Sequence, residues 1–501
     1  MTRGRVRLRH LYSDLEGSLE ELASDRGSVE SSRRVVESAL SDGNAYYGIN
    51  TGFGALARQR IPDGQLEQLQ WNLLVSHAVG VGEPVPREIT RLMLHLKLHA
   101  LGLGYSGISR PTLDRLLLFA QRDLVPLVPS RGSVGASGDL APLAHMSLPL
   151  VGLGELWDAD GRGSRPAAEV LAEHGLEPIA LRPKDGLSLV NGTQLMTAYG
   201  AWVLERCAHL VKVADITATI SLEALQGSIV PFDPRIQDAR PHPGQRAVAS
   251  NVRRLLEESA ILESHRHCGK VQDPYSLRCV PQVHGATRDA LGWAGEVVET
   301  EINSATDNPL VFEDGAILSG GNFHGQPLAL ALDLAAIAVA ELGSISERRS
   351  YLLLGGHDGL PPLLMKQTGT NSGLMIAQYT AAALVSENKG LCHPASVDSI
   401  PTSLGQEDHV SMGSIAAVKL LRVYENVVNV LGVELLCAAQ ALDYRELRPG
   451  RGVEVAHRSI RQRIEHTEAD HLLDRELARA AAIAGGSELV AEVEVAVGEL
   501  E

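Results

Sequence analysis

The chain has 501 residues, enough to bury a large core and to form about two to four domains. Hydrophobic residues make up 44% of the chain but aromatic residues only 4%, which favours closely packed helices of Leu, Ala, Val and Ile over an aromatic-rich β-sandwich. The formal net charge of −16 disfavours nucleic acid and anionic membranes as partners, because both reward clusters of Lys and Arg.

The first half of the chain is predicted to mix helices with loops. Residues 12–42 are charged and weakly amphipathic and predict a helix, and a Gly-rich turn follows at 48–54. Apolar residues recur at helical spacing over 66–103, with a break at 80–86, and 112–127 predicts another helix.

From residue 192 onward the chain predicts long helices rich in Ala and Leu. Apolar residues recur three and four apart over 193–230, 244–264, 285–304, 326–355, 372–390 and 408–443. Several of these helices are unusually long and apolar on nearly all faces, which predicts a central bundle that is buried further by oligomerisation. The last segment, 488–501, fits either a helix or a strand.

These patterns predict a mostly α fold with two parts. Residues 1–190 are expected to form a smaller N-terminal α+β region, in which 150–190 is an excursion rich in Gly, Pro and charge. Residues 191–501 are expected to form the helical bundle and the C-terminal helices. The longest apolar stretch, 327–342, is interrupted by acidic residues and is too short to span a bilayer, so it predicts a buried core helix.

The cysteines are few, odd in number and widely spread: Cys207, Cys268, Cys279, Cys392 and Cys437. This usage predicts reduced thiols in a cytoplasmic protein rather than a disulfide framework. The basic first ten residues are followed by no continuous apolar segment, so no signal peptide is expected.

The run SVGASGDLAP contains the tripeptide Ala136-Ser137-Gly138. Gly138 has no Cβ, so its nitrogen can come close to the carbonyl of Ala136. No genetically encoded side chain is a good electrophile, and chemistry that needs an electron sink normally recruits a cofactor. Taken alone, Ala-Ser-Gly is a common tripeptide that a loop or a helix N-terminus explains equally well.

Two further motifs present a polar side chain beside a Gly residue. Tyr47 opens YGINTGFG, and such loops carry function when a rigid scaffold holds them, although a turn with a packing tyrosine is the alternative. Asn191 lies in KDGLSLVNGTQ, which is predicted to end a loop and open a helix. Asn191 is therefore placed either to hydrogen-bond a reactive group or to cap the helix.

A third motif, SHRHCGKVQDPYSLRCVPQ, spaces Gln272, Tyr275 and Arg278 three apart, so on one helical turn they would share a face. In general, a phenol beside a guanidinium ionises more readily and becomes a useful base. Arginine also offers a two-pronged donor to a carboxylate. His265, His267 and Cys268 lie in the same motif, but no second ligand cluster at suitable spacing accompanies them, so no metal site is expected.

The remaining motifs are TDNP at 306–309, SGGNFHG at 319–325 and QEDH at 406–409, each explicable alone as a turn or a cap. Taken together and in this order, the motifs resemble the histidine and phenylalanine/tyrosine ammonia-lyase family over roughly residues 40–445. The resemblance implies a mostly helical fold and a homotetramer in which each active site takes residues from three subunits. It also implies that the tripeptide at 136–138 cyclises, with loss of two waters, into the electrophile 4-methylideneimidazol-5-one (MIO).

The reaction of this family is the non-oxidative loss of ammonia from an α-amino acid, a small-molecule substrate. An electrophile that captures the amine makes it a better leaving group, and a positioned base then removes the β-proton. The resemblance implies Tyr275 as that base and Tyr47 as a second acid/base on a closing loop. The remaining implied roles are contact with the MIO group or the amine (Asn191, Gln272), packing against the ring system (Phe323) and a clamp on the substrate carboxylate (Arg278, Asn308).

Ser76-His77, within NLLVSHAVG, and Glu407 resemble the pair of positions that sets substrate selectivity in this family. An imidazole substrate has a donor and an acceptor nitrogen that a buried site must pair, and His77 and Glu407 supply partners. Tyrosine enzymes also use His at the first position, so the acid at Glu407 is what favours histidine. The alternatives are a phenylalanine or tyrosine ammonia-lyase and an MIO-dependent aminomutase.

Two more distant alternatives are weaker. A non-catalytic relative has no physical reason to keep Tyr47, Ser137, Asn191, Tyr275 and Arg278 together. A fumarase-like lyase needs a catalytic serine in a Gly-Ser-Ser loop, which we do not find. The chain departs from the family in its N-terminus, where no clear apolar strand precedes residue 40, and this departure leaves the chemistry-bearing motifs intact.

Overall fold

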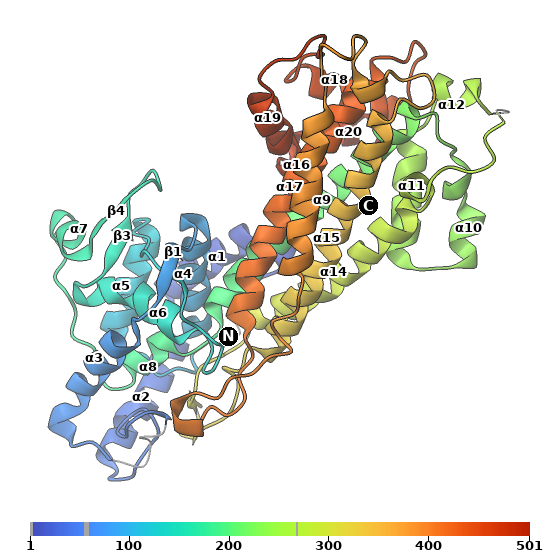
Figure 1. Ribbon diagram of the computed structural model, residues 1–501. Helices are drawn as coiled ribbons and strands as arrows, with labels where there is room; N and C mark the ends of the chain where they lie inside the picture. Colours follow the sequence, from blue (N-terminus) through green and yellow to red (C-terminus); the bar gives the residue numbers. More distant parts are fainter. Residues whose placement is uncertain (1–3, 55–59, 267–268) are drawn as a thin grey trace. The chain divides into compact units, whose positions relative to one another are not determined.

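The computed structural model describes residues 4–54, 60–266 and 269–501. The chain forms two compact units, each assembled from three segments (Figure 1). Unit 1 comprises Met1–Trp202, Gly295–Asp333 and Pro394–Val418, and unit 2 comprises Val203–Ala294, Leu334–His393 and Lys419–Glu501. The predicted boundary between residues 190 and 191 stays a prediction.

The helices of the N-terminal part are short, and all of them belong to unit 1. They are α1 (Leu11–Ser24), α2 (Gly27–Ser41), α3 (Leu66–His77), α4 (Arg87–Gly102), α5 (Arg110–Gln121), α6 (Leu140–Ser147), α7 (Ala167–Glu173) and α8 (Asp185–Val190). The segment 12–42 is helical as predicted, with a break between α1 and α2. The chain becomes extended at Asp25, whose carboxylate accepts a hydrogen bond from the Gly27 nitrogen at the start of α2.

Within the described ranges, the strands form three antiparallel pairs, all in unit 1. They are β1 (Val81–Pro84) with β2 (Pro129–Arg131), β3 (Glu155–Trp157) with β4 (Ser164–Pro166), and β5 (Leu310–Val311) with β6 (Ile317–Leu318). Strand β1 occupies the predicted break between α3 and α4. Strands β1 to β4 fit the predicted α+β character of residues 1–190, whereas β5 and β6 lie outside that range.

The second half of the chain forms the long helices that were predicted. They are α9 (Gln194–Ala224), α14 (Val280–Ile302), α15 (Gln326–Leu354), α16 (Met375–Leu391) and α17 (Gly413–Leu442). The shorter helices are α10 (Pro234–Ala239), α11 (Pro243–Leu255), α12 (Ala260–Ser264), α13 (Tyr275–Arg278), α18 (Arg451–Arg461), α19 (Asp474–Gly485) and α20 (Glu488–Val497). The segment 244–264 is thus two helices, α11 and α12, and the final segment is helical.

Among the described residues, one helix, α15, is long and apolar enough to span a membrane by length and composition. Two-thirds of its most apolar window (67%) is buried inside the protein. A core helix of this kind passes the same test, and the predicted burial of 327–342 is confirmed. The premise that this segment is too short to span a bilayer is wrong, because α15 extends over 29 residues.

Candidate active site

The Ala136-Ser137-Gly138 tripeptide lies in unit 1 on the loop between β2 and α6. Gly138 has φ +77° and forms an isolated parallel bridge with Gly192. A Cβ added at Gly138 would lie 2.0 Å from the Gly192 carbonyl oxygen, so no residue with a side chain fits there. The tripeptide is therefore in close backbone contact with the NGTQ motif.

The Ser137 carbonyl oxygen receives two donors from this motif. The Asn191 side-chain nitrogen Nδ2 donates to it at 3.3 Å, and the Gly192 main-chain nitrogen donates at 3.4 Å. Asn191 follows α8 with extended backbone angles, φ −89° and ψ 131°, rather than capping the start of a helix. Its Oδ1 is buried and has no hydrogen-bond partner among the described residues, which leaves one acceptor free next to the tripeptide.

Asp139 fixes the other end of the tripeptide. Its fully buried carboxylate accepts hydrogen bonds from the main-chain nitrogens of Leu195 and Met196, at 2.9 and 3.0 Å, in the first turn of α9. Ser414 donates to the same carboxylate at 3.1 Å. Burial raises the pKa of Asp139 to about 7 despite these donors. The loop is therefore attached to the N-terminus of a long core helix.

A cavity of about 510 Å³ opens over Ser137. Its lining contains five residues that the sequence predicted for the site: Tyr47, His77, Ser137, Asn191 and Glu407. Apolar side chains from α3, α6 and α8, including Leu73, Leu140 and Leu187, form much of the remaining wall. Motifs separated by hundreds of residues therefore meet around one cavity within unit 1.

Glu407 is oriented through both carboxylate oxygens. Thr402 donates from Oγ1 to Oε2 at 2.6 Å, and Ser137 donates from Oγ to Oε1 at 3.3 Å. His77, at the end of α3, forms a 3.0 Å hydrogen bond through Nδ1 with Ser76. Burial lowers the pKa of His77, opposed by a hydrogen bond to the Leu73 backbone and by the charge of Glu407. Burial therefore favours the neutral imidazole of His77, which lines the same cavity as Glu407.

The predicted residues of the third motif lie in unit 2. Gln272 and Arg278 line a cavity of about 360 Å³ there, and the Tyr275 side chain is 71% exposed. The Arg278 guanidinium carbon lies 4.7 Å from the centre of the Tyr275 ring, so these two are neighbours as expected. Gln272 does not share a helical turn with them as expected, because α13 begins at Tyr275 and Gln272 lies in the irregular segment before it.

The last two predicted residues, Asn308 and Phe323, belong to unit 1 but do not line the cavity over Ser137. The Asn308 side-chain oxygen accepts a hydrogen bond from the Gly320 nitrogen at 2.8 Å, which ties the TDNP and SGGNFHG motifs together. Phe323 is half-buried between β6 and α15. Their assigned roles stay predictions.

The described residues contain no group of three or more His, Cys, Asp or Glu side chains arranged to hold a metal ion. His265 uses both ring nitrogens on main-chain carbonyl oxygens, of Ile261 at 2.6 Å and Gly227 at 3.1 Å. His267 and Cys268 lie outside the described residues.

The sequence analysis did not identify three residues that the structure connects to the site. Asp139 and Thr402 hold the tripeptide and Glu407, as described above. Lys97, on α4, donates from its buried Nζ to the Asn191 main-chain oxygen at 2.6 Å. The available signal for Lys97 was a lysine inside the apolar run of a helix, RLMLHLKLHALG.

Comparison with known proteins gives one consistent result. A family model described as "Aromatic amino acid lyase" matches residues 13–462. The chain is 55% identical to a histidine ammonia-lyase of Anaeromyxobacter sp. (strain K), over 93% of this chain and 94% of the relative. Among solved structures it matches histidine ammonia-lyase from Trypanosoma cruzi with a TM-score of 0.87 and 41% identity, covering 96% of this chain and 93% of that one. A tyrosine aminomutase from Streptomyces globisporus matches with a TM-score of 0.91 and 34% identity, over 100% and 99% of the two chains.

Proposed function

Because this chain belongs to the aromatic amino acid lyase family and is an ammonia-lyase, we propose that it converts L-histidine into trans-urocanate and ammonia. One observation carries the choice of substrate: Glu407 is hydrogen-bonded to Ser137, and both line a cavity that His77 also lines. A carboxylate and a neutral imidazole can pair both nitrogens of a substrate imidazole, which a phenyl ring cannot use. Such an enzyme serves histidine catabolism, and we place it in the cytoplasm.

We further propose that Ala136, Ser137 and Gly138 form the MIO group. The Gly138 nitrogen bonds to the Ala136 carbonyl carbon, and two waters leave, one with the Ala136 oxygen and one with the Ser137 hydroxyl. The residues fit this group, because the contact at Gly138 excludes a Cβ and two donors already meet the Ser137 carbonyl. Once formed, the group supplies an electrophilic carbon that captures the substrate's amino nitrogen.

The residues around the tripeptide assist that chemistry electrostatically. The Asn191 amide and the Gly192 N–H both donate to the Ser137 carbonyl oxygen and would stabilise negative charge there, as paired donors do in an oxyanion hole. Loss of the Ser137 hydroxyl removes the partner of Glu407 Oε1, while Thr402 keeps holding Oε2. Oε1 then faces the cavity, where it would accept the imidazole N–H of histidine.

The remaining steps use residues on other motifs. Tyr275 would take the β-proton, Tyr47 would act as the second acid/base, and the Arg278 guanidinium would bind the substrate carboxylate in two-pronged fashion. Gln272 and Asn191 would contact the amine or the MIO group, Phe323 would pack against the ring system, and Asn308 would complete the carboxylate clamp.

We propose a homotetramer in which the active sites are shared between subunits. The support is exposed apolar surface on the long helices of unit 2, where Tyr351, Ile376 and Tyr379 are 58%, 55% and 59% exposed. Ile376 and Tyr379 lie three apart on one face of α16, where a second copy would cover them. The double substitution I376E/Y379E should therefore reduce the oligomer's mass in light scattering.

The substrate proposal is tested by incubating the purified enzyme separately with L-histidine, L-phenylalanine and L-tyrosine. Ultraviolet spectra distinguish urocanate, cinnamate and coumarate, and we expect urocanate from histidine. Cinnamate or coumarate without urocanate would contradict the histidine assignment, and a β-amino acid product would identify an aminomutase, the activity of one structural relative.

The MIO proposal has its own readout. The intact mass of the wild-type chain should be lower than the sequence mass by two waters. Ser137→Ala should lack this deficit and abolish turnover. A wild-type chain of unmodified mass would exclude the MIO group.

A further inference from the structure

Lys97 has no role in the mechanism above, yet its placement is unusual. Its side chain is 2% exposed in the middle of α4, and it does not line the cavity over Ser137. A buried ammonium loses its hydration, so lysine is rarely buried unless other groups compensate. Its Nζ donates a hydrogen bond to the main-chain oxygen of Asn191 at 2.6 Å. The ammonium of Lys97 is therefore buried at an energetic cost and is hydrogen-bonded to Asn191, the residue that contacts the tripeptide.

Lys97 is close to charged groups of both signs. Burial lowers the pKa of Lys97 to about 8, Asp307 and Asp139 oppose that shift, and the Lys184 charge adds to it. Lys184 is itself fully buried and forms a 2.8 Å ion pair with Asp307. At neutral pH Lys97 is therefore mostly protonated, and its charge is offset by carboxylates of unit 1.

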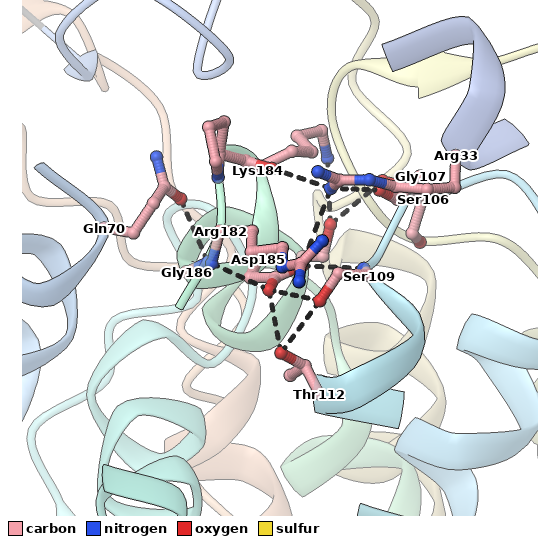
Figure 2. Close-up of polar contacts among 12 residues, drawn as sticks. Arg33, Gln70, Ser106, Gly107, Ser109, Thr112, Arg182, Lys184, Asp185 and Gly186 are labelled. Atoms are coloured by element: carbon pink, nitrogen blue, oxygen red, sulfur yellow. Dashed lines mark hydrogen bonds and ion pairs between the residues drawn. The ribbon is translucent and has the colours of Figure 1, made fainter. Parts of the chain in front are cut away.

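Other buried polar side chains hold the N-terminal end of α8, which is opposite to the end near Lys97 (Figure 2). Asp185, the first residue of α8, accepts hydrogen bonds from Ser109 Oγ at 2.6 Å and Thr112 Oγ1 at 2.7 Å. The next nitrogen, of Gly186, donates to Gln70 Oε1 on α3 at 2.9 Å. The start of α8 is thus anchored without Lys97, whose contact lies just beyond the other end of the helix.

The peptide group between Asn191 and Gly192 explains what that contact does. Its carbonyl oxygen accepts from Lys97, and its N–H donates to the Ser137 carbonyl. A peptide group is planar and rigid, so fixing its oxygen fixes the direction of its N–H. An ammonium on the carbonyl also polarises the group and strengthens the N–H as a donor.

We propose that Lys97 is a positioning residue of the reaction centre: its ammonium holds the Asn191–Gly192 peptide so that the Gly192 N–H and the Asn191 amide both meet the Ser137 carbonyl. This inference rests on the proposed MIO group, whose carbonyl would be that of Ser137. Lys97 acts through this peptide and does not touch the substrate.

The test is Lys97→Met, which keeps an unbranched side chain and removes the charge and the donors. Intact mass gives the fraction of chains short by two waters, and kinetic constants are expressed per modified chain. We expect kcat for histidine to fall about 10- to 100-fold, the range for a lost hydrogen bond to a charged group, with KM changed by less than about twofold. Sodium borohydride should also reduce modified Lys97→Met chains more slowly than modified wild-type chains, because the carbonyl is less polarised. Intact mass measures the rate of this reduction.

Lys212→Met is the matched control, because Lys212 pairs with Glu494 in unit 2 and should change neither readout. Lys97→Gln, a neutral donor, serves as the second variant if Lys97→Met does not fold, and should show a smaller loss of the same kind. Wild-type kcat and wild-type borohydride reactivity per modified chain in either variant, even with a lower Tm, would overturn the proposal. An unmodified wild-type mass would instead refute the MIO group itself.

Discussion

The predicted catalytic residues form two sets, one around Ser137 in unit 1 and one of Gln272, Tyr275 and Arg278 in unit 2. The two sets differ in how firmly their side chains are held. In unit 1, Ser137 is hydrogen-bonded to Asn191, Gly192 and Glu407, and its loop is attached to α9 through Asp139. In unit 2, Tyr275 is largely exposed. Ser137 is therefore held in a fixed position by several hydrogen bonds within unit 1, whereas most of the Tyr275 side chain is open to solvent.

The two sets also differ in what they can recognise. Glu407 and His77 line one cavity and are proposed to contact the substrate ring, which varies among aromatic amino acids. Arg278 suits the carboxylate and Tyr275 the β-proton, which all such substrates share. We therefore expect unit 1 to determine which amino acid reacts, and the unit 2 set to supply chemistry common to every substrate.

The largest expected effect is that of Tyr275→Phe. Removing a general base should lower kcat about 100- to 10,000-fold, and equally for any amino acid that the enzyme accepts. The two-water mass deficit should remain, because the residues around the tripeptide all belong to unit 1. A variant that folds but lacks the deficit would show that the two sets are not separable.

Mixing two inactive chains tests whether the sets come from different subunits. Co-expressed Ser137→Ala and Tyr275→Phe chains should form mixed oligomers in which some sites combine an intact tripeptide with an intact Tyr275. Activity should then exceed that of either variant alone. Mixed oligomers that stay inactive would mean that each site takes both residues from one chain.

A smaller and more selective effect is expected for Glu407→Gln. Replacing a charged acceptor by an amide should lower kcat/KM for histidine about 10- to 100-fold. Any activity on phenylalanine should be unaffected, because that ring offers no N–H to Glu407. Equal losses on both substrates would assign Glu407 to the common chemistry. Gln406→Ala, at the exposed neighbouring position, is the control.

Sequence reasoning reached the long helices because their Ala- and Leu-rich periodicity extends over many turns, as in α15 and α17. It failed where one residue ends a helix, as at Asp25, or at Glu258, whose φ of +63° falls between α11 and α12. Both departures are local backbone events that apolar spacing does not report.

The candidate site was predictable as a set of motifs and not as a geometry. The resemblance named Ser137 and Glu407, but only the fold shows a hydrogen bond between residues 270 positions apart. Lys97 and Thr402 escaped notice because neither has chemistry of its own in the reaction. Their importance lies in which atom each one contacts, and tertiary structure determines that.

Thr402→Val should produce the smallest effect and the sharpest comparison. The substitution keeps the shape of the side chain and removes the donor that holds Glu407 Oε2. We expect kcat/KM for histidine to fall about 3- to 10-fold, with no change in the two-water deficit. If Thr402 acts only through Glu407, Thr402→Val should cause little further loss of kcat/KM in a Glu407→Gln background. A double-mutant cycle measures this coupling. Additive losses would instead show that Thr402 affects the reaction independently of Glu407.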